Sequence, residues 1–238
     1  MSIGAVVVTY QTPAKLLARC RRSLKENGIT DQQVVNNSTN NLGFAAAANL
    51  GAKQLSNEFI LFLNPDAELT PHSLSLPVQY FSAHPKVAIL GPLMYGPDSV
   101  CEAGCYGQPI NLWSLFSRHL VTTRPPVNTQ AVGWISGGAM LVRRSVFRQL
   151  SGFDPNFFLY WEDVDLCRRV WHSGYAVHLL PAWRVFHRRG ASLSDLALKT
   201  RLYDKSADNY FRKHYSKPIW LLQHYLRLLY RLLSPVVH

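Results

Sequence analysis

Short apolar runs that alternate with helical patterns restrict most strongly how this chain of 238 residues can fold. Residues 3–9, 33–35 and 59–63 read as strands, because each run is short, apolar and followed by a polar turn. Residues 14–26 and 44–55 have helical patterns and lie between these strands. Because strands that alternate with helices form parallel sheets with helices on their faces, the sequence predicts an α/β fold.

The rest of the chain continues this pattern, except for residues 94–129, where Pro and Gly interrupt any periodicity. We expect strands at residues 87–90, 132–142, 176–180 and 183–186, and helices at residues 71–81, 145–150, 162–171 and 195–214.

Polar residues follow each of the first three strands, at the end of the sheet where such folds bind ligands. Thr9-Tyr10, Asn36-Asn37 and Asn64-Pro65-Asp66 occupy these positions. A carboxylate such as Asp66 suits a divalent cation that holds a diphosphate, and Asn64 is placed to add a carbonyl oxygen. The alternative is a turn, since Asn-Pro-Asp is a favourable turn sequence by itself.

Three carboxylates, Glu162, Asp163 and Asp165, lie directly behind Tyr160-Trp161 in a chain that has 14 acidic residues against 25 Lys and Arg. Carboxylates this close raise one another's pKa unless a cation or a proton lies among them. One interpretation is an active site. The other is a helix N-terminus, where acidic residues offset the helix dipole.

The spacing of these carboxylates separates their roles. Asp165 lies four residues before Arg169, so an ion pair within the helix is expected. Glu162 and Asp163 are then left to face a cleft, where one of them acts as a general base towards a hydroxyl. Trp161 offers an apolar face on which a sugar ring can stack.

His187 directly follows a predicted strand and precedes Arg188 and Arg189. One interpretation makes His187 a metal ligand, with the arginines facing phosphate. The other is a histidine at the surface or in the core, without a ligand.

The net charge of +11 favours polyanionic partners such as nucleic acid, anionic lipid or phosphorylated substrates. We expect no nucleic-acid partner, because the basic residues are dispersed and no nucleic-acid-binding motif is present. The four cysteines are scattered and form no zinc pattern. Residues 3–9 have no basic segment before them and do not resemble a signal peptide, so a cytoplasmic protein is expected.

The C-terminal residues 218–233 predict an amphipathic helix in which Gln223, Arg227 and Arg231 form a narrow polar stripe. The wide apolar face must be buried in the core, against a partner or in a membrane interface. Arginines among leucines and aromatic residues suit a membrane interface, and core packing remains the alternative.

Six segments in this order resemble the family 2 glycosyltransferases, and most closely the rhamnosyltransferase-like branch that builds bacterial surface polysaccharides. They are VVVTY (6–10), NNLGFAAAAN (40–49), FLNPDAEL (62–69), GGAMLVRRSVF (137–147), GFDPNFFLYWEDVDLCRR (152–169) and PAWRVFH (181–187).

The resemblance implies a GT-A fold, with a mostly parallel, Rossmann-like sheet flanked by helices. Residues 1–190 would form this domain, with a nucleotide-sugar half (1–92) and an acceptor half (93–190), and residues 191–238 a helical extension that contacts the membrane. It implies an inverting transfer, aided by Mg²⁺ or Mn²⁺, from a dTDP- or UDP-sugar to a saccharide or polyprenyl-linked acceptor. The enzyme would work at the inner face of the cell membrane.

The resemblance also implies a role for each matching residue. Asp66 and His187 take the places of residues that hold metal or diphosphate, and Asp163 takes the place of the catalytic base, supported by Glu162. The residues expected to border the nucleotide are Thr9, Tyr10, Asn36, Asn37, Asn41, Gly43 and Asn64, and those expected on the acceptor side are Trp161, Gly137 and Gly138.

Two departures from the family pattern concern the nucleotide. Asn36-Asn37 stands where the family has an Asp that grips the base, and the segment that follows is shorter than usual. Asn64 replaces the first Asp of the metal-binding motif, as in the rhamnosyltransferase-like branch. The alternative function is therefore a catalytically degenerate fold that serves as a membrane-associated binding or scaffold protein.

Overall fold

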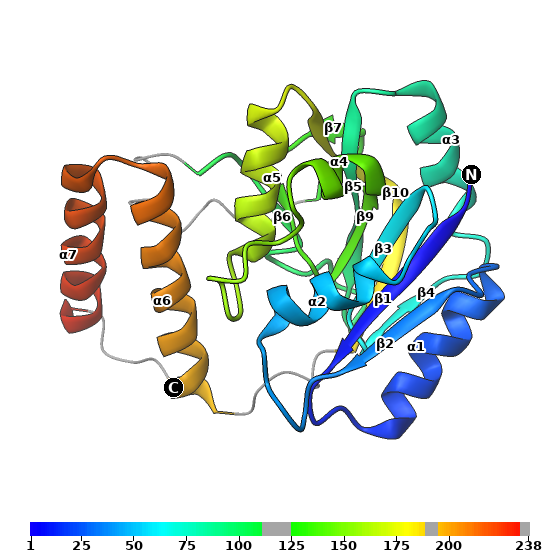
Figure 1. Ribbon diagram of the computed structural model, residues 1–238, viewed down its shortest axis with the longest axis horizontal. Helices are drawn as coiled ribbons and strands as arrows, with labels where there is room; N and C mark the ends of the chain where they lie inside the picture. The colour runs from blue at the N-terminus through cyan, green and yellow to red at the C-terminus, as the bar shows by residue number, and fades with distance from the viewer. Residues whose placement is uncertain (111–124, 189–194, 234–238) are drawn as a thin grey trace.

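The computed structural model describes residues 1–110, 125–188 and 195–233, the last four of these through their backbone alone. A central twisted sheet has helices on both faces, and two further helices stand as a pair at one side of the molecule (Figure 1). Arg189, which we predicted to face phosphate, lies outside the described residues.

The first half of the sheet is parallel, as predicted. β1 (Ile3–Thr9) lies between β2 (Gln32–Asn36) and β3 (Phe59–Leu63), and all three run in the same direction. The apolar side chains of β1 and β3 are mostly buried between the helices on the two faces, which explains why these two strands read as nearly continuous apolar runs, whereas β2 is only partly buried. The carboxyl ends of these strands therefore meet at one edge of the sheet.

The second half of the sheet mixes directions. β9 (Ala139–Arg143) is antiparallel to both of its neighbours, β3 and β5 (Val87–Tyr95). β10 (Ala176–His187) runs parallel to β5 as one long strand with irregular register, where the sequence predicted two strands. The pattern missed three short strands: β4 (Ala67–Leu69) and β7 (Gln130–Ala131), which pair with β10, and β6 (Tyr106–Gly107). The single strand predicted at residues 132–142 is divided into β9 and a short β8 (Trp134–Ile135), which pairs with β6.

The helices lie close to the predicted positions, and the first matches its predicted bounds. They are α1 (Ala14–Glu26), α2 (Phe44–Lys53), α3 (Ser75–Ala83), α4 (Arg144–Gln149), α5 (Glu162–His172), α6 (Leu196–His214) and α7 (Lys217–Leu233). The mostly parallel α/β sheet with flanking helices and a C-terminal helical extension is thus confirmed.

Asp165 joins α5 to α6. Its fully buried carboxylate accepts a hydrogen bond from Arg169 at 2.7 Å, which confirms the predicted ion pair. Lys213 and His214 of α6 also lie 2.7 Å from it. Burial alone would raise the pKa of Asp165, but the hydrogen bond from His214 and the charge of Arg169 outweigh it and lower the pKa to about 2.

α7 presents its polar stripe to α6 and its apolar face to solvent. Gln223 is buried, while His224 and Arg227 pair with Asp208 of α6, the former at 3.0 Å. The apolar face is not packed in the core: its side chains are 43–64% exposed at Leu222, Tyr225, Leu228 and Leu229. Among the described residues, no helix has both the length and the apolar character needed to cross a membrane.

We predict that Asp165→Asn lowers the free energy of unfolding at pH 7 by about 2 kcal/mol or more, measured by urea denaturation. The folded-state pKa lies below the unfolded value, so the carboxylate stabilises the fold above about pH 4. This contribution disappears as the pH falls towards 2. The variant should therefore lose less stability than the wild type between pH 5 and 2.

The control is Glu26→Gln, which removes an exposed ion pair with Arg22 and should cost less than about 1 kcal/mol. Equal losses in the two variants would show that Asp165 does not join α5 to α6.

Candidate active site

Backbone hydrogen bonds bring the predicted polar residues together at one edge of the sheet. Asn37 N donates to Thr9 O at 2.8 Å, and Asn64 N donates to Gly138 O at 2.9 Å. His187, at the end of β10, lies opposite Ala67 of β4, the residue that follows Asp66. The residues that follow β1, β2, β3 and β10 are therefore neighbours, as expected for a ligand site in such a sheet.

A pocket of about 190 Å³, which we call the donor pocket, opens at this edge. Five of the seven residues predicted to border the nucleotide line it: Tyr10, Asn37, Asn41, Gly43 and Asn64. Asp66, predicted to bind the metal, lines it as well. Residues 158–160, just before α5, form another wall. The sequence motif that contains them was recognised, but their place beside the nucleotide loop was not predicted.

The loop from Asn37 to Gly43 is held by its own amides. Asn37 Nδ2 donates to Asn41 Oδ1 at 3.0 Å, and Leu42 N donates to Asn37 Oδ1 at 2.9 Å. Asn41 Oδ1 also accepts from Gly43 N at 3.0 Å. The amide of Asn37 therefore stabilises the short loop and is not turned outwards to grip a nucleotide base.

Two residues predicted to border the nucleotide do not line the donor pocket. Thr9 is buried, and its hydroxyl donates to Val35 O at 3.3 Å. Asn36 is exposed, and its Oδ1 accepts from Ser38 N at 3.0 Å. The Thr9 hydroxyl therefore links β1 to β2, and the Asn36 side chain accepts a hydrogen bond within the turn that follows β2.

Gly43 lets this loop approach the segment before α5. Its φ of 81° lies in the left-handed region. A Cβ at this position would lie well under 3.0 Å from Phe158 O, the atom that accepts a hydrogen bond from Phe44 N at 2.7 Å. Only glycine satisfies both conditions, so this residue joins the two walls of the donor pocket.

Gly137 and Gly138 connect the carboxylate of Asp163 to the end of β3. Gly137 N donates to Asp163 Oδ2 at 2.8 Å, while Gly138 O accepts from Asn64 N. Val164 N donates to Asp163 Oδ1 at 2.8 Å. The glycine pair, which we predicted on the acceptor side, thus lies between the acceptor-side carboxylate and the donor pocket.

Glu162 and Asp163 form a coupled pair with different surroundings. Burial, and then the charge of Asp163, raise the pKa of Glu162 well above its usual value, and Glu162 Oε2 has no hydrogen-bond partner. Burial also raises the pKa of Asp163, but the N–H groups of Gly137 and Val164 oppose this. Because backbone N–H groups stabilise the charge on Asp163, the protonated form is favoured more strongly at Glu162 than at Asp163.

The backbone in front of this pair is strained. Tyr160 and Trp161 both have φ of 68°, in the left-handed region that costs a non-glycine residue about 1–3 kcal/mol. The Trp161 ring packs against α6, with centroid distances of 5.5 Å to Tyr203 and 5.1 Å to Tyr210. This geometry does not support the prediction that a sugar stacks on Trp161, because α6 aromatic rings cover the indole.

On the other side of the donor pocket, His187 links two carboxylates. Its Nε2 lies 3.1 Å from Asp66 Oδ1 and its Nδ1 2.9 Å from Glu102 Oε2. Burial alone would lower the pKa of His187, but these two hydrogen bonds raise it to about 9. Sequence reasoning missed Glu102, which lies in the segment without periodicity.

Asp66 and His187 are in direct contact, as the metal-site prediction requires. Within the described residues, no three or more His, Cys, Asp or Glu side chains converge as a ready cation site. A carboxylate oxygen and an imidazole nitrogen nevertheless suit Mn²⁺ or Mg²⁺ when phosphate oxygens of a substrate complete the coordination.

Comparison with known proteins supplies the context for this site. The family model described as "Glycosyl transferase family 2" matches residues 32–151, and one described as "N-terminal domain of galactosyltransferase" matches residues 118–189.

Two relatives are rhamnosyltransferases. The N-acetylglucosaminyl-diphospho-decaprenol L-rhamnosyltransferase of Mycobacterium tuberculosis is 30% identical over 207 residues, with 71% of this chain and 66% of that protein covered. Rhamnosyltransferase WbbL of Escherichia coli is 29% identical over 142 residues, with 55% of this chain and 52% of that protein covered. The chain thus spans slightly less than two thirds and about half of their lengths.

Solved structures show the same fold at low sequence identity. GalNAc-T7 with UDP, GalNAc and Mn²⁺ has a TM-score of 0.60 at 16% identity, covering 89% of this chain and 50% of that one. Staphylococcus aureus TarS in complex with UDP has a TM-score of 0.55 at 13% identity, covering 89% and 72%.

We predict that Gly43→Ala destabilises the protein by about 2–4 kcal/mol and abolishes thermal stabilisation by nucleoside diphosphates, because the added Cβ separates the two pocket walls. Gly28→Ala is the matched control, since Gly28 has a similar φ of 78° with nothing near its missing Cβ. It should cost only about 1 kcal/mol. Equal costs, with nucleotide stabilisation intact in both, would contradict the role of Gly43.

Proposed function

Because the chain belongs to glycosyl transferase family 2 and has its GT-A-like α/β fold, we propose that it transfers rhamnose or a related hexose from a nucleoside-diphosphate sugar to a lipid-linked saccharide. The names of the two rhamnosyltransferase relatives support rhamnose as the sugar, and one of them names a diphospho-decaprenol acceptor. We propose that the product enters a bacterial surface polysaccharide. The observation that carries the proposal is the bond from Gly137 N to Asp163, since this glycine pair also contacts the wall of the donor pocket.

We assign the donor pocket to the nucleoside diphosphate of the donor. Two solved structures of the same fold contain UDP, which supports a dTDP- or UDP-sugar here. Tyr10, Asn41 and Gly43 border the space for the nucleotide, and Asn64 and Asp66 lie at its diphosphate end.

We assign Asp66 and His187 to Mg²⁺ or Mn²⁺. A solved structure of the same fold contains Mn²⁺, and the two side chains are 3.1 Å apart in this chain. When bound, the cation neutralises charge on the leaving diphosphate as a Lewis acid. Glu102 holds the other nitrogen of His187 and so orients the ring towards Asp66.

Asp163 is the proposed general base. Its carboxylate takes the proton from the acceptor hydroxyl as that oxygen attacks the anomeric carbon and the diphosphate leaves. The N–H groups of Gly137 and Val164 hold the carboxylate in place. Burial raises the pKa of Glu162 well above its usual value, which favours its protonated form and supports a role other than that of a second base.

The apolar face of α7 supports a lipid-linked acceptor at a membrane surface. Side chains that would normally be buried, including Leu222 and Leu229, point to solvent, and exposed basic residues lie on the same helix pair at Arg201, Lys205, Arg212 and Lys217. An amphipathic helix with these properties binds in the headgroup region of anionic membranes. The proposed site of action is therefore the inner face of the cell membrane.

We predict that Asp163→Asn lowers kcat for sugar transfer by about 10²–10⁴-fold while the affinity for the nucleoside diphosphate is retained. Calorimetric titration with the nucleotide and a turnover assay with a panel of nucleoside-diphosphate sugars would measure both. Glu162→Gln, which imitates the protonated side chain, should cause a smaller loss. Turnover near the wild-type level in Asp163→Asn would rule out the base assignment.

We also predict that Leu222→Glu combined with Leu229→Glu reduces binding to vesicles containing phosphatidylglycerol by at least about tenfold, measured by flotation. Leu76→Glu is the control, because Leu76 is an exposed leucine on α3, outside the proposed membrane face. Unchanged flotation of the double variant would show that the apolar face of α7 does not bind the membrane.

A further inference from the structure

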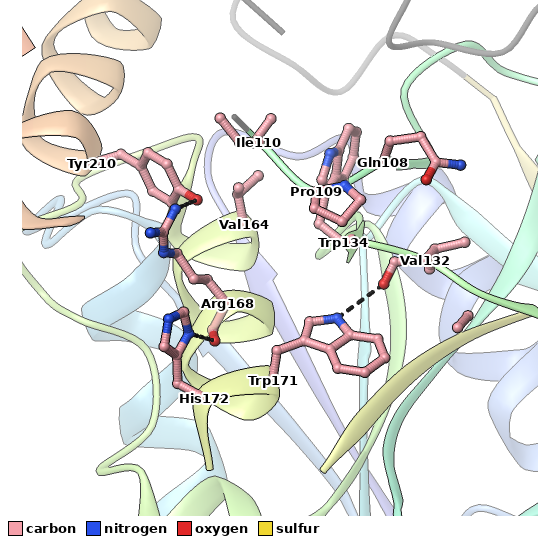
Figure 2. A pocket seen from close by; sticks show the side chains of 12 residues that line it. Gln108, Pro109, Ile110, Val132, Trp134, Val164, Arg168, Trp171, His172 and Tyr210 are labelled. Atoms are coloured by element: carbon pink, nitrogen blue, oxygen red, sulfur yellow. Dashed lines mark hydrogen bonds between the residues drawn. The ribbon is translucent and has the colours of Figure 1, made fainter. Parts of the chain in front are cut away.

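A second cavity lies beside the proposed base, separate from the donor pocket. It has a volume of about 440 Å³ and shares no lining residue with the donor pocket. One wall is α5, which contributes Val164, Arg168 and Trp171, and residues 108–110 and 131–134 form the opposite wall (Figure 2). We call this cavity the α5 pocket.

Both walls of the α5 pocket begin next to the proposed reaction site. Val164 directly follows Asp163, and Trp134 lies three residues before Gly137, which binds Asp163. Three residues of extended chain span at most about 10 Å, so the near end of the pocket lies within this distance of the base. The cavity then extends along α5 to His172, two helical turns or about 12 Å further.

The pocket walls are largely apolar, and several of their polar groups bind one another. Trp134 Nε1 and Arg168 Nε have no hydrogen-bond partner among the described residues, but both atoms are buried. Trp171 Nε1 donates to Val132 O at 3.0 Å, so the indole turns its polar edge into the wall (Figure 2). The guanidinium of Arg168 donates to the hydroxyls of Tyr210 and Tyr215, at 3.2 and 2.8 Å, and stacks on the Tyr215 ring. Pro109, Ile110, Val132 and Val164 supply the rest of the surface.

These walls suit a hydrocarbon better than a saccharide. The hydroxyls of a sugar would lose water here and find few free partners, which is unfavourable. An apolar chain would bury its surface against the rings of Trp134 and Trp171. Tyr210 of α6, the helix against which α7 packs, borders the pocket at the end where Ile110 and Val164 lie (Figure 2).

We propose that the α5 pocket binds the first units of the hydrocarbon chain of the lipid-linked acceptor, with Trp171 as a residue that selects acceptors carrying such a chain. This inference rests on the proposed function for the identity of the acceptor. The saccharide end of the acceptor reaches Asp163, and the chain lies along α5 from Val164 to Trp171.

The first test compares two acceptors that carry the same sugar: N-acetylglucosamine linked through diphosphate to a farnesyl chain, and its methyl glycoside. Trp171→Ala should raise KM about tenfold or more for the farnesyl acceptor and leave KM for the methyl glycoside unchanged. Trp171→Phe keeps an aromatic ring, so its KM for the farnesyl acceptor should stay close to the wild-type value. Leu76→Ala, at a leucine with the same 38% exposure as Trp171, is the control and should change neither value.

Direct binding of a hydrocarbon to the α5 pocket can be measured without knowing the acceptor sugar. Farnesyl phosphate, titrated calorimetrically below its micelle concentration, should bind the wild type. The Trp171→Ala variant should bind it about tenfold or more weakly than the wild type does. Binding of inorganic phosphate should not depend on Trp171. This outcome would support the pocket even if the proposed acceptor sugar were wrong.

Three results would overturn the inference. An equal rise in KM for both acceptors would assign the pocket to the saccharide. Binding of farnesyl phosphate that does not depend on Trp171, or that is absent, would exclude a hydrocarbon here. A dimer in sedimentation that Trp171→Ala dissociates would assign the pocket to a second copy of the chain.

Discussion

Two backbone hydrogen bonds at one glycine pair hold the site together. The N–H of Gly137 binds the carboxylate of Asp163 at the start of α5, and the carbonyl of Gly138 accepts from Asn64 at the end of β3. The space around these residues leaves little room for side chains: a Cβ on Gly138 would lie 3.2 Å from Asn64 Nδ2. The antiparallel strand β9 brings this pair to the edge where the parallel strands end, so the geometry of both halves of the site depends on it.

The different surroundings of Glu162, Asp163 and Asp165 give these neighbouring carboxyl groups different roles. Asp165 is stabilised as an anion by Arg169, Lys213 and a hydrogen bond with His214, and Asp163 by the N–H groups of Gly137 and Val164. Within the part of the chain that the structure describes, Glu162 has no such partner from another residue at its Oε2 atom. Asp165 therefore has a structural role and Asp163 is the proposed base, while Glu162 is the residue whose protonated form is most favoured. Tyr160 and Trp161 adopt the left-handed backbone conformation where α5 starts, and this conformation costs free energy.

Much of the fold could be predicted because local patterns determine it. Residues 14–26 form α1 as expected, and the first three strands follow from their apolar runs. The pairing of Asp165 with Arg169 also followed from helical spacing alone. The directions of β9 and β10 could not be predicted, since a buried strand has the same apolar pattern whichever way it runs.

The details of the site depended on contacts between distant residues. Glu102 lies 85 residues before His187, in a segment without the periodicity that would predict a helix or strand. The amide of Asn37 is bound by its own loop, and rings of α6 pack against Trp161, contacts that the residue types alone did not indicate. The outward orientation of the apolar face of α7 follows from acidic partners on α6, which the helical pattern of α7 alone could not reveal.

The central claim is that one carboxylate, Asp163, activates the acceptor beside a nucleoside-diphosphate sugar. The anomeric configuration of the product tests it most directly, measured by NMR on sugar transferred from a donor of known configuration. A single displacement assisted by one base predicts inversion at the anomeric carbon. Retention of configuration would contradict the account, because it requires a different arrangement of groups around the donor sugar.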